Sequence, residues 1–342
     1  TQAEMNKVSK EIGMLMKNGQ SAEAENAKKK TADLKEDIKN MGDHLAETEN
    51  LLSAKLVLLP NLPHESVPTG KTPEDNVVVR SGGPEAVPAP EKLPHWDLAK
   101  KYDLIDFELG NKLTGAGFPV YKGKGAKLQR ALISFFLDEA TNAGFLEVLP
   151  PFMVNEDSGF GTGQLPDKEG QMYHCTADNF YLIPTAEVPV TKIIRDVILD
   201  HKELPVNMTA YTPCFRREAG SYGKDVRGLN RLHQFDKVEI VVVEHPEKSY
   251  ARLEEIVKHV EGLVNKLGLP YRILRLCGGD MSFTSALTYD FEVFSTAQQR
   301  WLEVSSVSNF ETFQANRLYL RFRDEQSKKS TLAKSHYGSA VA

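Results

Sequence analysis

The first 56 residues carry a helical pattern of hydrophobic positions. Two series step by three and four residues: Met5, Val8, Ile12 and Leu15, then Leu34, Ile38, Met41, Leu45, Thr48 and Leu52. This spacing is typical of helices that pack along a shared apolar seam. Lys17-Asn18-Gly19-Gln20 lies between the two series and is a turn signal. Residues 1–56 are therefore predicted to form an antiparallel two-helix coiled coil.

Proline interrupts the pattern in the next segment. Eight of the 18 prolines fall between residues 57 and 94. Proline lacks an amide donor and breaks both helices and strand ladders, so residues 57–93 are predicted to be an extended linker. One short strand is expected within it, from Asn76 to Arg80.

Helical and strand patterns alternate over residues 94–342. An amphipathic helix is predicted from Gly125 to Gly144, and a second helix spans residues 246–268. Strand-like runs follow with little helix between them: YRILRLC, TYDFEVF and RWLEVSSV. This order favours an antiparallel sheet flanked by helices, an α+β fold, over a parallel one.

Composition excludes little. The chain has 342 residues, 26% of them charged, with a net charge of −5, which does not indicate nucleic-acid binding by itself. Cys175, Cys214 and Cys277 show no paired spacing, so free thiols in a reducing compartment, the cytoplasm, are expected. No hydrophobic run approaches the roughly 20 residues of a membrane span. Neither a dinucleotide-binding nor a P-loop motif is present, so any nucleotide must bind by another design.

Candidate chemistry concentrates between Thr209 and Val243, which reads as strand, Gly-, Ser- and Asp-rich loop, and strand. If Arg216 and Glu218 end the first strand, they point the same way, because side chains two apart share a face. Phe235, Lys237 and Glu239 share a face of the second strand for the same reason. Such a face suits a ligand with phosphates and a base. A two-stranded edge held by cross-strand ion pairs remains an alternative.

Two further pairs of residues have side-chain oxygens that could bind a cation. Thr185 and Glu187 are two apart on a predicted strand at residues 180–191, where they could hold an ammonium group. The residues alone favour a surface Thr-x-Glu on a strand. Glu303 and Ser306 would leave a regular strand on opposite faces, so a shared role requires a bulge. Alone, they read as a surface carboxylate and a ladder residue. Residues 160–171 are Gly-rich and are predicted to be a loop.

The run FRREAGSYGKDVRGLNRLHQFDKVEIV resembles motif 2 of class II aminoacyl-tRNA synthetases, in the form of bacterial-type seryl-tRNA synthetases. The resemblance extends along nearly the whole chain. It includes GTGQLP, the Thr185-Ala186-Glu187 triplet and a helix–strand–proline order similar to motif 1, the class II dimer interface. It implies a class II catalytic domain at residues 94–342 and a tRNA-binding arm at residues 1–56.

The resemblance also implies roles for individual residues. Arg216 is the expected catalytic residue, and serine is expected to bind Thr185, Ala186, Glu187, Arg216, Glu239 and Ser339. ATP is expected to bind Arg216, Arg217, Glu218, Arg231, Leu232, His233, Gln234, Phe235, Glu303, Val304, Ser305 and Ser306. Glu303 and Ser306 are the expected Mg²⁺ ligands. The implied partners are L-serine, tRNA(Ser) and a second copy of the chain, with no membrane.

The last residues depart from the family's pattern. Motif 3 of the seryl enzymes reads roughly LNGSALALPR, whereas this chain reads KSHYGSAVA. Tyr337 stands where Asn is expected, and the closing Arg is absent. We expect both chain ends to be truncated relative to the family. Two other functions stay open: a paralogue that charges a carrier protein, and a non-catalytic RNA-binding relative.

Overall fold

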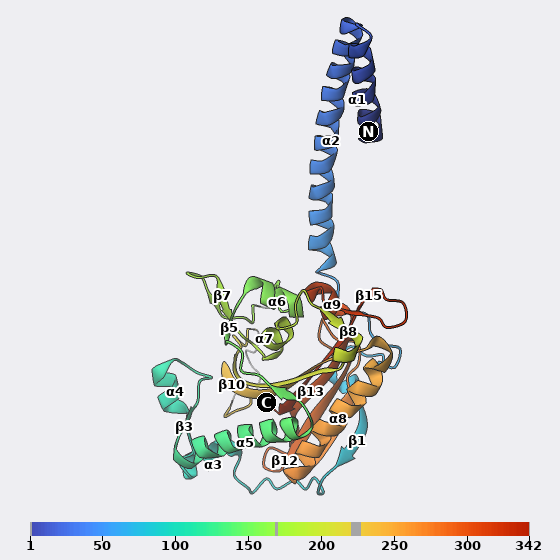
Figure 1. Ribbon diagram of the computed structural model, residues 1–342. Helices are drawn as coiled ribbons and strands as arrows, with labels where there is room; N and C mark the ends of the chain where they lie inside the picture. The colour runs from blue at the N-terminus through green and yellow to red at the C-terminus, as the bar shows by residue number, and fades with distance from the viewer. Residues whose placement is uncertain (1, 168–169, 220–226, 342) are drawn as a thin grey trace. The chain divides into compact units, whose positions relative to one another are not determined.

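A computed structural model describes residues 2–167, 170–219 and 227–341, with the side chains of 340 and 341 left out (Figure 1). The chain divides into two compact units, Thr1–Pro60 and Asn61–Ala342. The Gly-, Ser- and Asp-rich loop predicted after Glu218 falls largely outside the described residues, as does part of the loop predicted at residues 160–171.

The smaller unit is the predicted pair of helices, α1 (Gln2–Lys17) and α2 (Ser21–Leu56). Gly19 between them adopts φ +75°, which a residue without a Cβ atom reaches at little cost. Val8, Ala24 and Leu34 are buried at the seam. The later seam positions Met41, Leu45, Thr48 and Leu52 are exposed. The reason is length, because α1 has 16 residues and α2 has 36.

The larger unit is built on an eight-stranded sheet (Figure 1). Its order is β1 (Val77–Gly82), β11 (Tyr271–Arg275), β12 (Leu287–Ser295), β13 (Arg300–Glu311), β16 (Lys334–Val341), β10 (Gln234–Glu244), β9 (Val206–Phe215) and β4 (Leu146–Glu147). Every neighbouring pair is antiparallel except β4 with β9. The predicted antiparallel α+β fold is confirmed.

The two faces of β10 carry different chemistry. Its even-numbered residues Ile240 and Val242 pack in the main core with α8 (Ser249–Lys266), and Val238 packs with α5 (Gly123–Asn142). Its odd-numbered residues Val241 and Val243 belong to a second core with α7 (Glu187–Lys192) and α9 (Phe313–Leu318). Burial on both faces explains the continuous run of β-branched residues that ends this strand.

Shorter elements surround this sheet. They are α3 (His95–Lys101), β2 (Ile105–Asp106), α4 (Phe107–Leu113), β3 (Val120–Tyr121), β5 (Met153–Asn155), α6 (Glu156–Thr162), β6 (His174–Cys175), β7 (Phe180–Leu182), β8 (Ile198–Asp200), β14 (Arg321–Arg323) and β15 (Ser330–Leu332), with 3-10 turns at Pro73–Asp75, His201–Glu203 and Pro246–Lys248. None of the helices among the described residues combines the length and hydropathy needed to cross a membrane.

The structure corrects three expectations about local structure. The segment predicted as a linker is built into the larger unit: β1 pairs with β11, and the Asn61 amide donates to the carbonyls of Thr284 and Phe310. Residues 160–162, predicted as loop, end α6, because Asn155 caps that helix through the Ser158 amide. The strand predicted at residues 180–191 stops at Leu182. Proline at 184 and a helix that starts at residue 187 prevent its continuation.

The main core gives a direct test of this architecture. Phe291 on β12 is fully buried among residues of β10, β11, β13 and α8. Phe291→Ala should lower the free energy of unfolding by about 3–5 kcal/mol, the usual cost of a large cavity in a packed core. Leu113→Ala, at a position that is 69% exposed, is the matched control and should change it by less than about 0.5 kcal/mol. Urea unfolding measures both, and equal effects would contradict the assigned core.

Candidate active site

The site begins on the odd-numbered face of β10. Lys237 Nζ lies 2.6 Å from Glu239 Oε1, so the predicted shared face of these residues is confirmed. Asp236 faces the other way and accepts from the Tyr211 hydroxyl at 2.7 Å and from Gln129 of α5. Burial raises the pKa of Asp236. Alternation along one strand thus directs the Asp236 carboxylate toward α5 and the Glu239 carboxylate toward Lys237.

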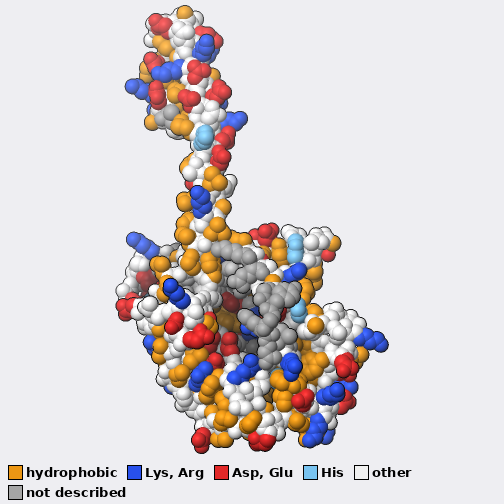
Figure 2. Space-filling view, turned by 180° about the vertical axis from the view of Figure 1, so that it is seen from behind, with side chains coloured by type: hydrophobic (Ala, Val, Ile, Leu, Met, Phe, Trp, Pro, Cys, Tyr) orange, Lys and Arg blue, Asp and Glu red, His pale blue; other side chains and the backbone are white. Residues whose placement is uncertain are grey.

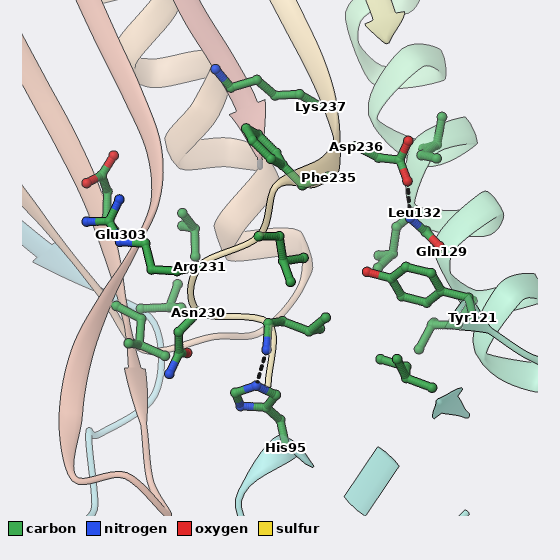
Figure 3. A pocket seen from close by; sticks show the side chains of 18 of the residues that line it. His95, Tyr121, Gln129, Leu132, Asn230, Arg231, Phe235, Asp236, Lys237 and Glu303 are labelled. Atoms are coloured by element: carbon green, nitrogen blue, oxygen red, sulfur yellow. Dashed lines mark hydrogen bonds between the residues drawn. The ribbon is translucent and has the colours of Figure 1, made fainter. Parts of the chain in front are cut away.

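A cavity of about 920 Å³ opens beside the start of β10. In Figure 2 this unit is hollowed on the face turned to the viewer, and acidic and basic side chains lie in and around the hollow. Figure 3 shows Arg231 and Glu303 on one side and Gln129, Tyr121 and Asp236 on the other. Seven residues that the sequence assigned to ATP line this cavity: Arg216, Glu218, Arg231, Leu232, Phe235, Glu303 and Val304.

Arg216 lies one residue beyond the end of β9. Its Nε donates to the Pro184 carbonyl at 3.2 Å, and its guanidinium lies 5.1 Å from the centre of the Phe235 ring. Two contacts therefore fix the guanidinium at the cavity wall, and the planar group stacks as arginine commonly does on aromatic faces.

Glu218 reaches the same cavity by another route than predicted. β9 ends at Phe215, and Glu218 adopts φ +49°, so strand alternation does not place Arg216 and Glu218. Glu218 pairs with Arg231 at 3.5 Å across the loop. Arg216 and Glu218 therefore reach the same cavity from the segment that follows β9, not from the strand itself.

A bulge in β13 resolves the spacing of Glu303 and Ser306. Glu303 pairs with Glu292 and Ser305 pairs with Phe291, which leaves Val304 without a partner in the ladder. One extra residue in a strand lets positions three apart share a face. The bulge that the sequence required is therefore present.

Asp290 stands directly opposite Ser306 on β12. Burial and the neighbouring Glu303 carboxylate raise its pKa well above the ordinary range, and burial also raises the pKa of Glu303. Asp290 Oδ1 has no hydrogen-bond partner among the described residues. Two carboxylates beside a hydroxyl, one of them with an unsatisfied oxygen, fit a hard divalent cation such as Mg²⁺.

Glu239 is the most densely bonded residue of the site. Its side chain is buried and accepts from Thr185 Oγ1 at 2.7 Å and from the Glu187 amide at 2.8 Å. Lys237 and the Tyr337 hydroxyl complete the set. A carboxylate deprived of water needs several such donors to stay charged.

Glu187 does not share a face with Thr185, contrary to the strand prediction. It opens α7, its carboxylate accepts from Gln314 of α9, and its backbone amide points to Glu239. Burial and the nearby Glu239 carboxylate raise the pKa of Glu187 to about 7. This carboxylate therefore changes its charge near neutral pH.

The other predicted residues lie outside the cavity lining. Ser339 accepts from the Ser306 amide at 3.0 Å and donates to Ser305 Oγ at 3.2 Å, so it joins β16 to β13. A ring nitrogen of His233 lies 2.7 Å from the Tyr173 hydroxyl, with which it forms a hydrogen bond. The Arg217 guanidinium lies 5.7 Å from the centre of the Tyr173 ring. Gln234 is exposed, and Ala186 is fully buried before α7. These residues therefore do not contact the cavity directly.

Sequence reasoning gave no role to Lys237, Asp290 or Gln314. The sequence could have indicated that Lys237 belongs to the site, because it lies between Phe235 and Glu239 on one face of the strand. Asp290 and Gln314 had none, because only pairing across the sheet and packing of α9 bring them to the site.

The chain matches known protein families over both units. Residues 173–342 match the family described as tRNA synthetase class II core domain (G, H, P, S and T). Residues 1–63 match the seryl-tRNA synthetase N-terminal domain. The fold and the site thus define a class II aminoacyl-tRNA synthetase.

Individual relatives narrow this class. The serine–tRNA ligase of Salinibacter ruber is 49% identical over 341 residues, covering 100% of this chain and 80% of the relative. That of Trichlorobacter lovleyi is 50% identical over 319 residues, covering 92% of this chain and 75% of the relative. The crystal structure of a seryl-tRNA synthetase from Pyrococcus horikoshii, complexed with ATP, superposes with a TM-score of 0.92 at 33% identity, covering 100% of this chain and 80% of that one. The chain belongs to the seryl-tRNA synthetase family.

The pKa of Glu187 predicts how stability depends on pH. Its folded pKa lies near 7 and its ordinary value is 4.5, so the unfolded state releases the proton first. Stability associated with the protonated carboxyl should be fully present below pH 4.5 and be lost as the pH rises to about 7, by about 1 kcal/mol per pH unit. Glu187→Gln, which keeps a neutral side chain, should flatten this slope. Urea unfolding between pH 5 and 7.5 measures it, and identical slopes in both proteins would contradict the assignment.

Proposed function

We propose that this protein activates L-serine with ATP and transfers the seryl group to tRNA(Ser). One observation carries the proposal most directly: Arg216, Glu218, Phe235 and Glu303, from different segments, line one cavity in a chain of this family. The reaction class follows, because serine's carboxylate attacks the α-phosphorus of ATP, which forms seryl-adenylate and releases pyrophosphate. A ribose hydroxyl of the terminal adenosine of the tRNA then attacks the seryl carbonyl, which forms the seryl ester and releases AMP.

ATP fits the cavity residues by chemistry. Arg216 is placed to hold the α-phosphate and stabilise its charge as the bond to pyrophosphate breaks. Phe235 offers a face to the adenine ring, and the Glu218 carboxylate offers an acceptor to its amino group. Arg231 is assigned to the terminal phosphates. Its pairing with Glu218 must then loosen when ATP enters.

Mg²⁺ is proposed to bind Glu303 and Ser306, with Asp290 beside them. The raised pKa of both carboxyls and the unsatisfied Asp290 oxygen support a cation here. When bound, the ion would neutralise phosphate charge. Glu303 also lies within the electrostatic reach of Arg216, Lys237 and Arg231, all of which oppose its neutralisation.

Serine is proposed to bind beyond Lys237, around Glu239. The Glu187 carboxylate would hold the ammonium group, with Thr185 beside it and Ala186 and Ser339 in the surrounding wall. The Glu239 carboxylate would accept from the serine hydroxyl. A site that pairs a substrate hydroxyl rejects an analogue without it strongly, because the buried acceptor is then left unpaired.

The proposed division of labour follows the sequence. Residues 1–56 would contact tRNA and residues 94–342 would catalyse, with a second copy of the chain completing a homodimer. The match of residues 1–63 to the seryl-tRNA synthetase N-terminal domain supports the first assignment. Free thiols at Cys175, Cys214 and Cys277 support a cytoplasmic location.

The role of Arg216 can be tested by serine-dependent ATP–pyrophosphate exchange. Arg216→Ala should reduce the exchange rate by at least ~10²-fold, the scale of losing one transition-state donor. Arg216→Lys should recover only part of it, since an ammonium lacks the planar fork. Arg195→Ala, which removes an ion pair with Asp157 away from the cavity lining, is the control and should retain the parental rate. Near-parental exchange in Arg216→Ala would refute the assignment.

The arm can be tested by deletion. The Asn61–Ala342 unit contains its own cores, so removal of residues 1–56 should leave it folded and able to form adenylate. Charging of tRNA(Ser) should fall to background, because the proposed tRNA contact is gone. Exchange and charging assays on the same preparation separate the two steps. Charging at the parental rate would show that the arm is dispensable.

A further inference from the structure

We propose that the Tyr337 side chain occupies the amino-acid subsite of this chain, with its hydroxyl on Glu239 in the place that the serine hydroxyl must take. Serine would then bind only after Tyr337 is displaced. The inference rests on the proposed function, because it assigns Glu239 to the substrate hydroxyl.

The Glu239 carboxylate is already saturated with hydrogen-bond donors. Its two carboxylate oxygens already accept from four donors: Thr185 Oγ1, the Glu187 amide, Lys237 Nζ and the Tyr337 hydroxyl. Two of these donors are side-chain hydroxyls, the chemical group that serine presents, and they belong to Thr185 and Tyr337. Thr185 belongs to the triplet assigned to serine, whereas Tyr337 stands where motif 3 of the family carries Asn. Tyr337 is therefore the donor that a serine hydroxyl can replace.

The Tyr337 ring takes up the volume next to Glu239. Tyr337 lies on β16, where its backbone pairs with Val241 and Ser308, and its side chain is buried. Lys237 Nζ lies 5.1 Å from the ring centre, and the hydroxyl lies 3.4 Å from Thr185 Oγ1. The ring thus fills the space between the residues assigned to serine. Motif 3 of the family carries Asn at this position, and the Asn side chain would leave most of the volume of the tyrosine ring empty.

The cavity ends before it reaches the residues assigned to serine. Arg216, Lys237 and Glu303 line it, whereas Thr185, Glu187, Glu239 and Tyr337 do not. The described residues therefore leave the ATP part of the site open and the amino-acid part closed. Lys237 stands at the boundary and contacts both Glu239 and Tyr337.

Binding of serine is the direct test. Calorimetry would measure L-serine affinity in the presence of adenosine 5′-(α,β-methylene)triphosphate for the parent, Tyr337→Asn and Tyr337→Phe. Tyr337→Asn should bind serine at least about tenfold more tightly, the scale of a hydrogen bond to a charged group. Tyr337→Phe keeps the ring and should gain less than about threefold. Tyr337→Ala, which adds no polar group, should gain as Tyr337→Asn does. Unchanged affinity for the nucleotide analogue reports that each variant is folded.

The outcomes separate this inference from the proposed function. Equal serine affinity in the parent, Tyr337→Asn and Tyr337→Ala would overturn the occupied subsite, as would an equal gain in Tyr337→Phe. Serine-dependent pyrophosphate exchange by the parent would then leave the proposed function intact. Conversely, tighter serine binding in Tyr337→Asn without exchange in any variant would support the occupied subsite and overturn activation of serine.

Discussion

The need to satisfy one buried carboxylate organises the site. Glu239 lies in the middle of β10 with 1% exposure, where a charge without donors would cost several kcal/mol. Its donors come from the segment before α7, from α7 itself, from β10 and from β16. A change that moves any one of these segments leaves the carboxylate short of a partner. Segments far apart in sequence are therefore held together by one acceptor.

The strand beneath Glu239 explains how a stable sheet carries this charge. Even-numbered side chains of β10 pack against α5 and α8, and odd-numbered ones run from the apolar second core to Glu239, Lys237 and Phe235. The polar stretch lies at the end where the cavity opens. Apolar burial along the rest of both faces stabilises the strand that positions the charged residues.

Periodicity in the sequence predicted what depends on local geometry. Both arm helices, α5, α8 and the strands from β11 to β13 follow directly from spacing. The bulge at Val304 was expected only because the family resemblance gives Glu303 and Ser306 a shared role. The fold around Thr185 did not follow, because Pro184 and the packing of α7 override an alternating pattern that reads as a strand. Asp290 and Gln314 could not be found from sequence, since sheet register and helix packing bring them to the site. The roles of the ATP and serine residues remain predictions.

Charge is divided between two parts of the site. Lys237 and Arg216 lie close enough to Glu187 and Glu303 to oppose the rise in pKa that burial causes in both carboxyls. A triphosphate in the cavity would attract the same two side chains, Lys237 and Arg216. Their positive charge would then offset less of the negative charge of Glu187 and Glu303. An ammonium group at Glu187 and a divalent cation at Glu303 would restore that compensation, so nucleotide, metal and amino acid should favour one another's binding. If Tyr337 occupies the amino-acid subsite as proposed, it would weaken this coupling, because its hydroxyl bonds Glu239 and contributes no charge.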